Sequence, residues 1–370
     1  MRATEDEVGD PEVAGPAPSA RSRRRQVVRA VVTLIVVVVA AVFVLPELVD
    51  VSEVWRQVRA MTGLEVSVLA LAAVANLASY CAVNLVATPG LTGSQSLVLT
   101  ASTTAAANTV PGGGAVAVGL TYAMLSSWGF SRSRSTFTVV VSGIWDNFAK
   151  LGLPIVALAI LSLGGGARDG RTAVALFALC GLVGAMVVFV LVLRSEAFAA
   201  RVGVMAGRWA SRARRALGRG PVGGWDLAVV KFRGRVIDLV RRRWLALTAA
   251  TLAQHLTLYS VLLISLRQIG VSDDDVGWAE VLAVLSFARL LTAIPITPGG
   301  IGVIELALIA GLSGAGGDHA QVVGAVLVFR VLTFLLPIPL GFGTYLFWRR
   351  NRSWLDSAPP LEAGRTRTST

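Results

Sequence analysis

Apolar residues in this chain fall into blocks that are separated by short polar segments. Several blocks reach about 20 residues, the length at which an α-helix crosses the hydrocarbon core of a bilayer. We predict six full spans, at residues 29–45, 64–87, 135–163, 172–193, 244–266 and 320–348. The pattern therefore predicts an all-α polytopic membrane protein.

Two further apolar stretches, near residues 97–127 and 277–312, are interrupted by Pro111-Gly112-Gly113-Gly114 and Pro298-Gly299-Gly300. Proline removes a helix hydrogen bond, and consecutive glycines weaken a helix further. Each stretch therefore predicts two half-helices around a break. A re-entrant hairpin satisfies this pattern, because irregular backbone at membrane depth must be buried in protein or line a wet cavity. A kinked pair of fully spanning helices is the alternative.

The two membrane halves, residues 29–193 and 244–348, repeat one order of elements: a span, a broken stretch and a long span containing proline. If both hairpins return to the side they entered from, the first enters from the cytoplasm and the second from outside. This is an inverted repeat, which many transporters use to alternate access to a site at the bilayer midplane. Residues 1–28 and 349–370 are expected to be cytoplasmic tails, the first of them disordered.

Composition and charge agree with a membrane protein. Hydrophobic residues make up 54% of the chain and charged residues 15%, with a net charge of +12. Basic residues flank the apolar blocks and concentrate in the segments placed inside, as the positive-inside rule requires. We therefore expect a multi-pass protein of a bacterial inner membrane, with both termini cytoplasmic and Asp273–Asp275 outside. Nucleic-acid binding is not expected.

The basic segment 194–243 lies between the two halves and carries two apolar stripes at helical spacing. We interpret it as a cytoplasmic amphipathic helical pair on the inner membrane surface. A solvated basic loop is the alternative. The sequence contains no Walker loop, nucleophile elbow, dinucleotide fingerprint or metal-ligand spacing. We therefore expect no enzyme activity, no cofactor and no metal.

Charged side chains at membrane depth are costly and are functional candidates by default. Arg289, Glu305 and Arg330 lie close to the second break or on the span expected to pack against it. An arginine there can grip a lipid phosphate with two hydrogen bonds. A structural ion pair that holds the hairpin to the last span is the alternative, and a mixed role is our hypothesis.

Two other groups are candidates for contact with an anionic headgroup. Asp146 and Lys150 lie four residues apart and share a helix face, so a headgroup site and an intrahelical pair are equally open. The second group comprises Asn108 and the glycines at the breaks, whose amides are freed from helical bonding; the glycines are Gly112, Gly113, Gly299 and Gly300. Close helix packing is the alternative for the glycines. His255 is interpreted as a packing residue rather than a proton relay.

The second break also carries a family resemblance. Residues 297–305, Thr-Pro-Gly-Gly-Ile-Gly-Val-Ile-Glu, followed by Phe329-Arg330, resemble the flippase-like membrane part of lysylphosphatidylglycerol synthase proteins. The resemblance covers residues 29–348 and implies a lipid flippase fold with two re-entrant hairpins related by pseudo-symmetry. Only the short polar stretch 351–370 follows the last span, so we expect neither the soluble aminoacyl-transferase domain nor lysyl transfer.

The function expected from these features is that of a lipid flippase or scramblase. It would move an anionic phospholipid or a lipid-linked envelope precursor, with anionic membrane lipids as its partners. A secondary transporter for a small anionic solute is one alternative. A non-transporting scaffold that binds an envelope-lipid biosynthesis enzyme is another.

Overall fold

The computed structural model of the chain describes residues 61–110, 112–163, 225–291 and 298–351, together with residues 59, 201, 204 and 205. This part contains helices and no strand, which confirms the predicted all-α class. The elements in chain order are α4 (Gly63–Ala87), α5 (Gly93–Thr109), α6 (Gly113–Ser127), α7 (Arg132–Leu163), α10 (Trp225–Ile269), α11 (Trp278–Leu291), η2 (Pro298–Gly300), α12 (Val303–Ala315), α13 (His319–Arg330), η3 (Val331–Leu335) and α14 (Pro337–Arg350).

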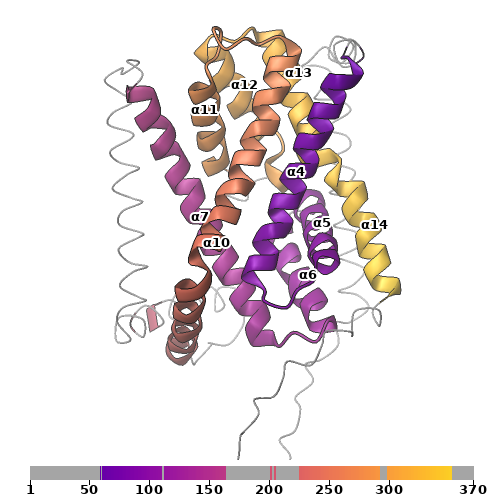
Figure 1. Ribbon diagram of the computed structural model, residues 1–370, viewed down its shortest axis with the longest axis vertical. Helices are drawn as coiled ribbons and strands as arrows, with labels where there is room; N and C mark the ends of the chain where they lie inside the picture. The colour runs from indigo at the N-terminus through magenta and orange to yellow at the C-terminus, as the bar shows by residue number, and fades with distance from the viewer. Residues whose placement is uncertain are drawn as a thin grey trace, which may run out of the picture.

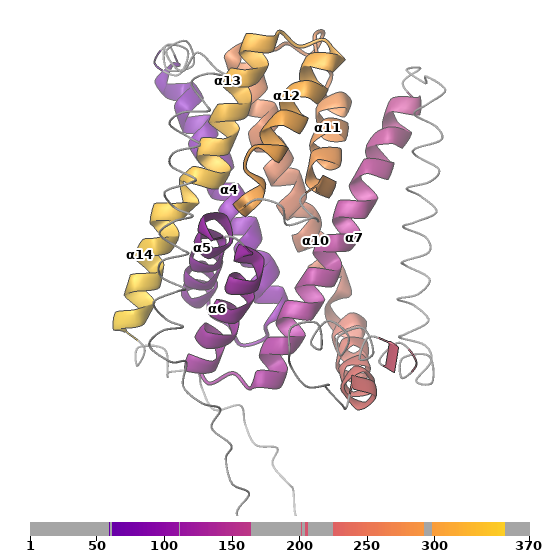
Figure 2. The same ribbon diagram turned by 180° about the vertical axis from the view of Figure 1, so that it is seen from behind.

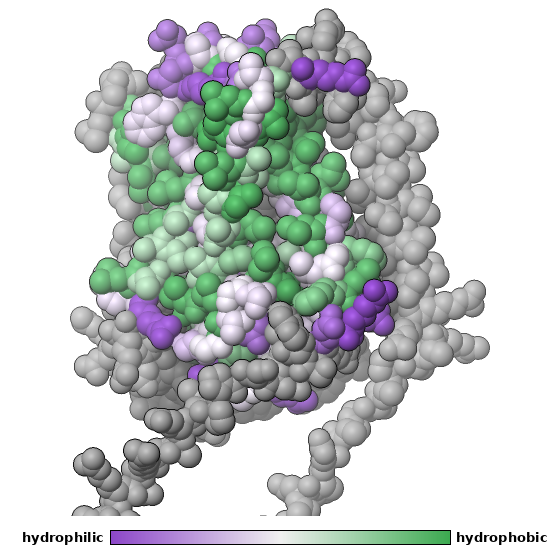
Figure 3. Space-filling model, turned by 45° about the vertical axis from the view of Figure 1, so that its right-hand side comes forward, coloured by the Kyte–Doolittle hydropathy of each residue, from purple (hydrophilic) through white to green (hydrophobic). Residues whose placement is uncertain are grey.

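Four segments of the described chain are long and apolar enough to cross a membrane; they are Gly63–Ala87, Arg132–Leu161, Arg243–Ile269 and His319–Arg350. They coincide with four of the predicted spans. The other two predicted spans, residues 29–45 and 172–193, lie outside the described residues. The space-filling view shows an apolar band between hydrophilic residues at its two ends (Figure 3), as a bilayer requires.

Helix α10 is longer than the span predicted within it. It begins at Trp225 and continues to Ile269, so the second half of the predicted amphipathic pair and the predicted span 244–266 form one helix. The reason is that residues 225–269 contain no proline and are rich in helix-forming Arg, Leu and Ala. Most of the first half of that pair lies outside the described residues.

Helix α4 packs along α10. It begins at Thr62, whose side chain accepts from the Glu65 N–H while a Glu65 carboxylate oxygen accepts from the Thr62 N–H at 2.7 Å. Farther along, Thr257 of α10 hydrogen-bonds Asn76 at 3.2 Å and Ser79 at 2.9 Å. Such polar contacts between small side chains hold helices together where lipid supplies no hydrophobic driving force.

Helices α5 and α6 form the first short pair, and the predicted first break separates them. Gly112 adopts a left-handed φ of +67°, which ends one helix and starts the next. The outer ends of the pair return to one place, because Leu91 before α5 and Trp128 after α6 belong to one buried cluster with Trp348. The pair occupies one half of the height of the helical body (Figures 1 and 2).

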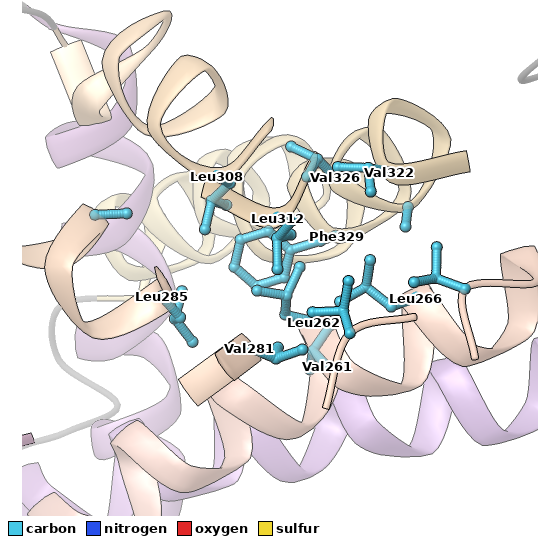
Figure 4. Close-up of a cluster of buried hydrophobic side chains, with 14 of the residues drawn as sticks. Val261, Leu262, Leu266, Val281, Leu285, Leu308, Leu312, Val322, Val326 and Phe329 are labelled. Carbon is cyan, nitrogen blue, oxygen red and sulfur yellow. The ribbon is translucent and has the colours of Figure 1, made fainter. Parts of the chain in front are cut away.

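Helices α11 and α12 form the second short pair, in the opposite half of the body (Figures 1 and 2). Their outer ends also meet, since a Cβ on Gly316, just after α12, would lie 2.7 Å from the Asp275 carbonyl oxygen. A buried core joins this pair to α10 and α13 (Figure 4); it includes Leu262, Leu285, Leu308, Leu312 and Phe329. Residues 292–297, between α11 and η2, lie outside the described residues.

Loop 270–277, between α10 and α11, carries the three aspartates and is held by local polar contacts. Arg267 pairs with Asp273 at 2.5 Å and also donates to the Val271 and Val276 carbonyls at 2.9 Å. Hydrogen bonds from the Ser272 hydroxyl and the Ser272 backbone N–H lower the pKa of Asp275 below its usual range. The loop therefore keeps its acidic character at neutral pH.

The long proline-containing helix of each half packs against the first short helix of the other half. Helix α7, which contains Pro154, packs against α11, and α14, which begins at Pro337, packs against α5. The second contact is close, because a Cβ on Gly341 would strike the backbone of Ala101. The two halves are therefore interlocked through their long helices.

Candidate functional site

Ionisable side chains gather at two places in the middle of the long helices. The first is the pair Glu305–Arg330, called here the Glu305 clamp. Arg330 Nε donates to Glu305 Oε1 at 2.6 Å, and the second carboxylate oxygen accepts from the Gly302 N–H at 2.8 Å. The Glu305 carboxylate lies in the first turn of α12 and faces Arg330 at the end of α13. It therefore caps the start of α12 and also fixes α12 to α13.

Arg330 makes further contacts inside the protein. Its guanidinium lies 4.4 Å from the ring centroid of Phe334, and its Nη2 is 3.4 Å from the Gly299 carbonyl oxygen. The side chain is 11% exposed. Protein groups therefore occupy the Arg330 Nε and one face of its guanidinium. This arrangement favours a structural ion pair over headgroup contact for Arg330.

The breaks of the two short pairs meet beside this clamp. Asn108, at the end of α5, donates to the Phe334 carbonyl oxygen at 3.2 Å. Gly299 lies against the same residue, since a Cβ there would strike the Phe334 ring and lie 3.2 Å from Asn108 Oδ1. Gly299 also has a φ of +57°. The η3 turn of the last span therefore lies between the two breaks.

The second place is the Asp146 cluster, which joins three helices. Asp146 and Lys150 of α7 form the predicted i, i+4 pair, with Lys150 Nζ 2.6 Å from Asp146 Oδ2. From α10, Gln254 Nε2 donates to Asp146 Oδ1 at 3.4 Å and His255 Nε2 lies 3.3 Å from the same oxygen. From α11, Arg289 Nη2 lies 4.0 Å from it.

The structure therefore separates the three residues that the sequence grouped at the second break. Glu305 and Arg330 pair with each other, whereas Arg289 faces Asp146. The cause is the packing of α11 on α7, while α12 packs on α13.

A small hollow adjoins the Asp146 cluster; it is lined by Lys150, Leu153, His255, Tyr259, Leu282, Leu285, Ser286 and Arg289. Lys150 and Arg289 bring two basic groups to it, and their carboxylate partner is Asp146. The site thus presents two basic side chains beside apolar ones. Such a site can hold an anionic oxygen group.

The glycines at the breaks fill several roles. A Cβ on Gly113 would strike the Ala107 carbonyl oxygen, so close packing accounts for this position, as the alternative proposed. Gly112, Gly299 and Gly300 have positive φ values, which accounts for glycine through backbone conformation. Donation of their amides to a ligand stays a prediction. In the described part of the chain, no group of three or more His, Cys, Asp or Glu could hold a metal.

Phe334, Tyr259 and Ser286 of the two sites were not predicted. Phe334 follows Arg330 by four residues, and this spacing places the two on one helix face, so the sequence contained a usable signal. Tyr259 and Ser286 are single polar residues among apolar ones and gave none.

A comparison with protein families completes the description of the site. The sequence model of the family described as lysylphosphatidylglycerol synthase TM region matches residues 29–341. This range includes both sites and every described helix up to the middle of α14. No protein with a curated description matches the chain.

Proposed function

The chain belongs to the family of the lysylphosphatidylglycerol synthase TM region, and on that premise we propose that it moves an anionic lipid between the leaflets of a bacterial inner membrane. The lipid is an anionic phospholipid or a lipid-linked envelope precursor. Its headgroup enters the protein while its acyl chains stay in the bilayer.

The observation that carries this proposal is that two basic side chains, Lys150 and Arg289, line one hollow at the Asp146 cluster. Lys150 and Arg289 are 19% and 18% exposed and share one carboxylate at membrane depth. Basic side chains at that depth are functional candidates by default, and a lipid phosphate is an anion that such groups bind. Arg289 suits this role, because it lines the hollow and a guanidinium binds phosphate in a bidentate manner.

The helix arrangement supports alternating access to such a headgroup. We interpret the pairs α5–α6 and α11–α12 as re-entrant hairpins that enter from opposite sides. With the predicted spans 29–45 and 172–193 they give six full spans in an inverted repeat. The interlocked contacts, α7 on α11 and α14 on α5, are those expected of two halves related by a pseudo-two-fold axis. Rocking of one half against the other would expose the region between the breaks to each side in turn.

Charge distribution supports an orientation. Arg134 lies 5.7 Å from the Phe130 ring centroid and Arg349 lies 5.9 Å from the Tyr345 centroid. Phe130 and Tyr345 belong to, or pack on, the buried cluster of α5, α6 and α14, so both arginines are at one end. Loop 270–277 with its aspartates is at the other end (Figure 1). By the positive-inside rule the arginine end and both termini are cytoplasmic.

The test is exchange of headgroup-labelled phosphatidylglycerol between the leaflets of liposomes that contain the purified protein. We expect exchange above that of protein-free liposomes. Arg289→Lys should lower the rate at least about tenfold, because lysine cannot reproduce a bidentate contact that contributes about 1.5–3 kcal/mol. Arg349→Lys, an exposed arginine at a helix end, is the matched control and should retain the wild-type rate.

Two results would overturn the proposal. The first is accumulation of a water-soluble anion in the liposomes without any movement of lipid, which is the behaviour of a secondary solute transporter. The second is stable binding of an envelope-lipid enzyme by a protein that moves neither lipid nor solute. Full activity of Arg289→Lys would remove Arg289 from the headgroup site and leave the glycine amides as candidates.

A further inference from the structure

The last span is continuous along the chain but belongs to two packing units. We call them the α13 unit, which comprises α10, α11, η2, α12 and α13, and the α14 unit, which comprises α5, α6 and α14. Figure 2 shows α13 beside α12 and α14 beside α5. Helix α13 is fixed in its unit by the Glu305 clamp and by Phe329, which is buried in the core shared with α10 and α12 (Figure 4).

Helix α14 is fixed to its own unit by polar contacts. Thr344 hydrogen-bonds Ser102 of α5 at 2.9 Å. Trp348 Nε1 donates to the Ser127 hydroxyl at the end of α6, also at 2.9 Å. The two arms of the last span are therefore held by different partners, and a movement of one unit against the other must be absorbed between them.

The five-residue turn η3 joins the two arms and is itself poorly packed. None of its residues is buried, and Val331 and Leu335 are 48% and 55% exposed. Its backbone forms a wide turn, in which the Leu336 N–H donates to the Val331 carbonyl, five residues earlier, at 2.8 Å. A segment with few buried contacts opens at low cost, and single wide turns are frequent at functional sites.

The sequence around η3 explains the wide turn. Pro337 and Pro339 have no N–H, so the carbonyls of Thr333 and Leu335 lack the donors that a regular α-helix would supply. The Thr333 hydroxyl also donates to the Phe329 carbonyl at 2.7 Å, a contact that bends helices. Three side chains therefore weaken the helix at one place.

Contacts from both breaks hold η3 in its present conformation. Asn108 of the α14 unit donates to the Phe334 carbonyl at 3.2 Å. Gly299 of the α13 unit lies against the Phe334 ring, and the Arg330 guanidinium lies over the same ring. Phe334 thus contacts both units, so these contacts must change when one unit moves relative to the other.

We propose that the last span bends at η3 when the α14 unit moves relative to the α13 unit, and that the hydrogen bond from Asn108 to Phe334 is the latch of this hinge. The inference rests on the proposed function, because it supplies the movement that opens the region between the breaks to each side. Helix α14 has 14 residues, so its far end lies about 20 Å from the hinge. A bend of about 20° moves that end by about 7 Å.

Distances between spin labels measure this movement in protein reconstituted in phosphatidylcholine liposomes, which supply no anionic lipid. In a chain without native cysteines, the labels are carried by Arg243→Cys on α10 and Arg350→Cys on α14, both at exposed positions. We expect two distances that differ by about 7 Å. The control pair, Ser94→Cys on α5 with Arg350→Cys, lies within the α14 unit and should give a single distance.

Asn108→Ala tests the latch. Loss of one hydrogen bond of typical strength should change the ratio of the two distances about fivefold, in favour of the conformation that the latch opposes. A contact between Asn108 and an anionic headgroup would not produce this change, because the liposomes contain no such lipid.

Pro337→Ala/Pro339→Ala tests the hinge, because it restores two backbone donors to the last span. Two restored hydrogen bonds correspond to about a thirtyfold shift toward one conformation, so a single distance is expected. Lipid exchange should be slowed at least about tenfold. Pro154→Ala, in a helix that continues through its proline, should leave two distances, and the exposed Leu336→Ala should leave lipid exchange unchanged.

The outcomes separate this inference from the proposed function. A single distance in the wild type, or a failure of either variant to alter the two distances, would overturn the inference even if lipid exchange is normal. If the proline variant does not fold, the wild type and Asn108→Ala still decide the question. Two distances that respond to both variants, in a protein that exchanges no lipid, would support the hinge and overturn the proposed function.

Discussion

Replacement of Glu305 by Gln tests whether the Glu305 clamp stabilises the fold. Glutamine keeps the shape of the side chain and one carbonyl oxygen for Arg330 Nε, but it removes the negative charge. Arg330 and Glu305 are 11% and 22% exposed, so solvent screens this pair only in part. The variant therefore leaves a guanidinium at membrane depth without a counter-charge.

The magnitude follows from the contacts that remain. Loss of one partner of a fully buried ion pair costs about 3–5 kcal/mol. Arg330 keeps its contact with the Phe334 ring and its weak bond to the Gly299 carbonyl, and the glutamine oxygen still accepts a charge-assisted hydrogen bond. We therefore expect a loss of about 2 kcal/mol, which is roughly a thirty-fold change in the ratio of folded to unfolded protein.

The assay is unfolding of the detergent-solubilised protein by a denaturing surfactant, followed by circular dichroism. Glu65→Gln is a matched control, because Glu65 also accepts from the backbone N–H at the start of its helix, in an exposed hydrogen bond of 2.7 Å. Glu65 has no cationic partner among its hydrogen bonds. Glu65→Gln should lower the free energy of unfolding much less than Glu305→Gln does. The difference between the two variants reports the ion pair rather than the helix cap.

A double-mutant cycle with Arg330→Met completes the design. A coupling free energy of about 1–3 kcal/mol between positions 305 and 330 is expected for a pair in direct contact. Equal losses in Glu305→Gln and Glu65→Gln, or additive effects in the cycle, would refute the clamp. Folded Glu305→Gln protein should exchange lipid at the wild-type rate if the clamp is structural, because both carboxylate oxygens and the Arg330 Nε bind protein groups.

Three further predictions use the same preparation. Gly299→Ala should destabilise the protein by about 2 kcal/mol or more, because Gly299 has a positive φ and its Cβ would strike the Phe334 ring. Gly314→Ala should be neutral, because a Cβ at Gly314 meets open space. Equal effects of the two variants would contradict the contact between the breaks. In a chain without native cysteines, Asp274→Cys should react with an impermeant label outside intact cells and Arg350→Cys should not; the reverse pattern would invert the orientation. Asp146→Asn should lower the free energy of unfolding by about 3 kcal/mol, because it leaves Lys150 and Arg289 without their carboxylate. Unchanged stability against the surfactant would show that the cluster is neutralised in another way.

The sequence by itself determined the helical class, four described spans and the positions of both breaks. These features follow from local chemistry. A bilayer requires every backbone polar group to be satisfied within the segment, so an apolar block of sufficient length forms a helix. Proline followed by consecutive glycines ends that helix, as between Thr109 and Gly113, whereas the single Pro154 lies inside α7. The i, i+4 pair of Asp146 and Lys150 was predictable for the same reason, because it depends on one helix alone.

Tertiary structure alone decided which charged groups meet. Arg289 and Arg330 are similar in sequence terms, since each lies on an apolar helix, one just before the second break and one on the span expected to pack against it. Only the packing of α11 on α7 brings Arg289 to Asp146, and only the packing of α13 on α12 brings Arg330 to Glu305. His255, interpreted from the sequence as a packing residue, faces a carboxylate from another helix. The apolar pattern specifies the length of a helix, but in lipid nearly every face is apolar, so it does not specify which face meets which neighbour.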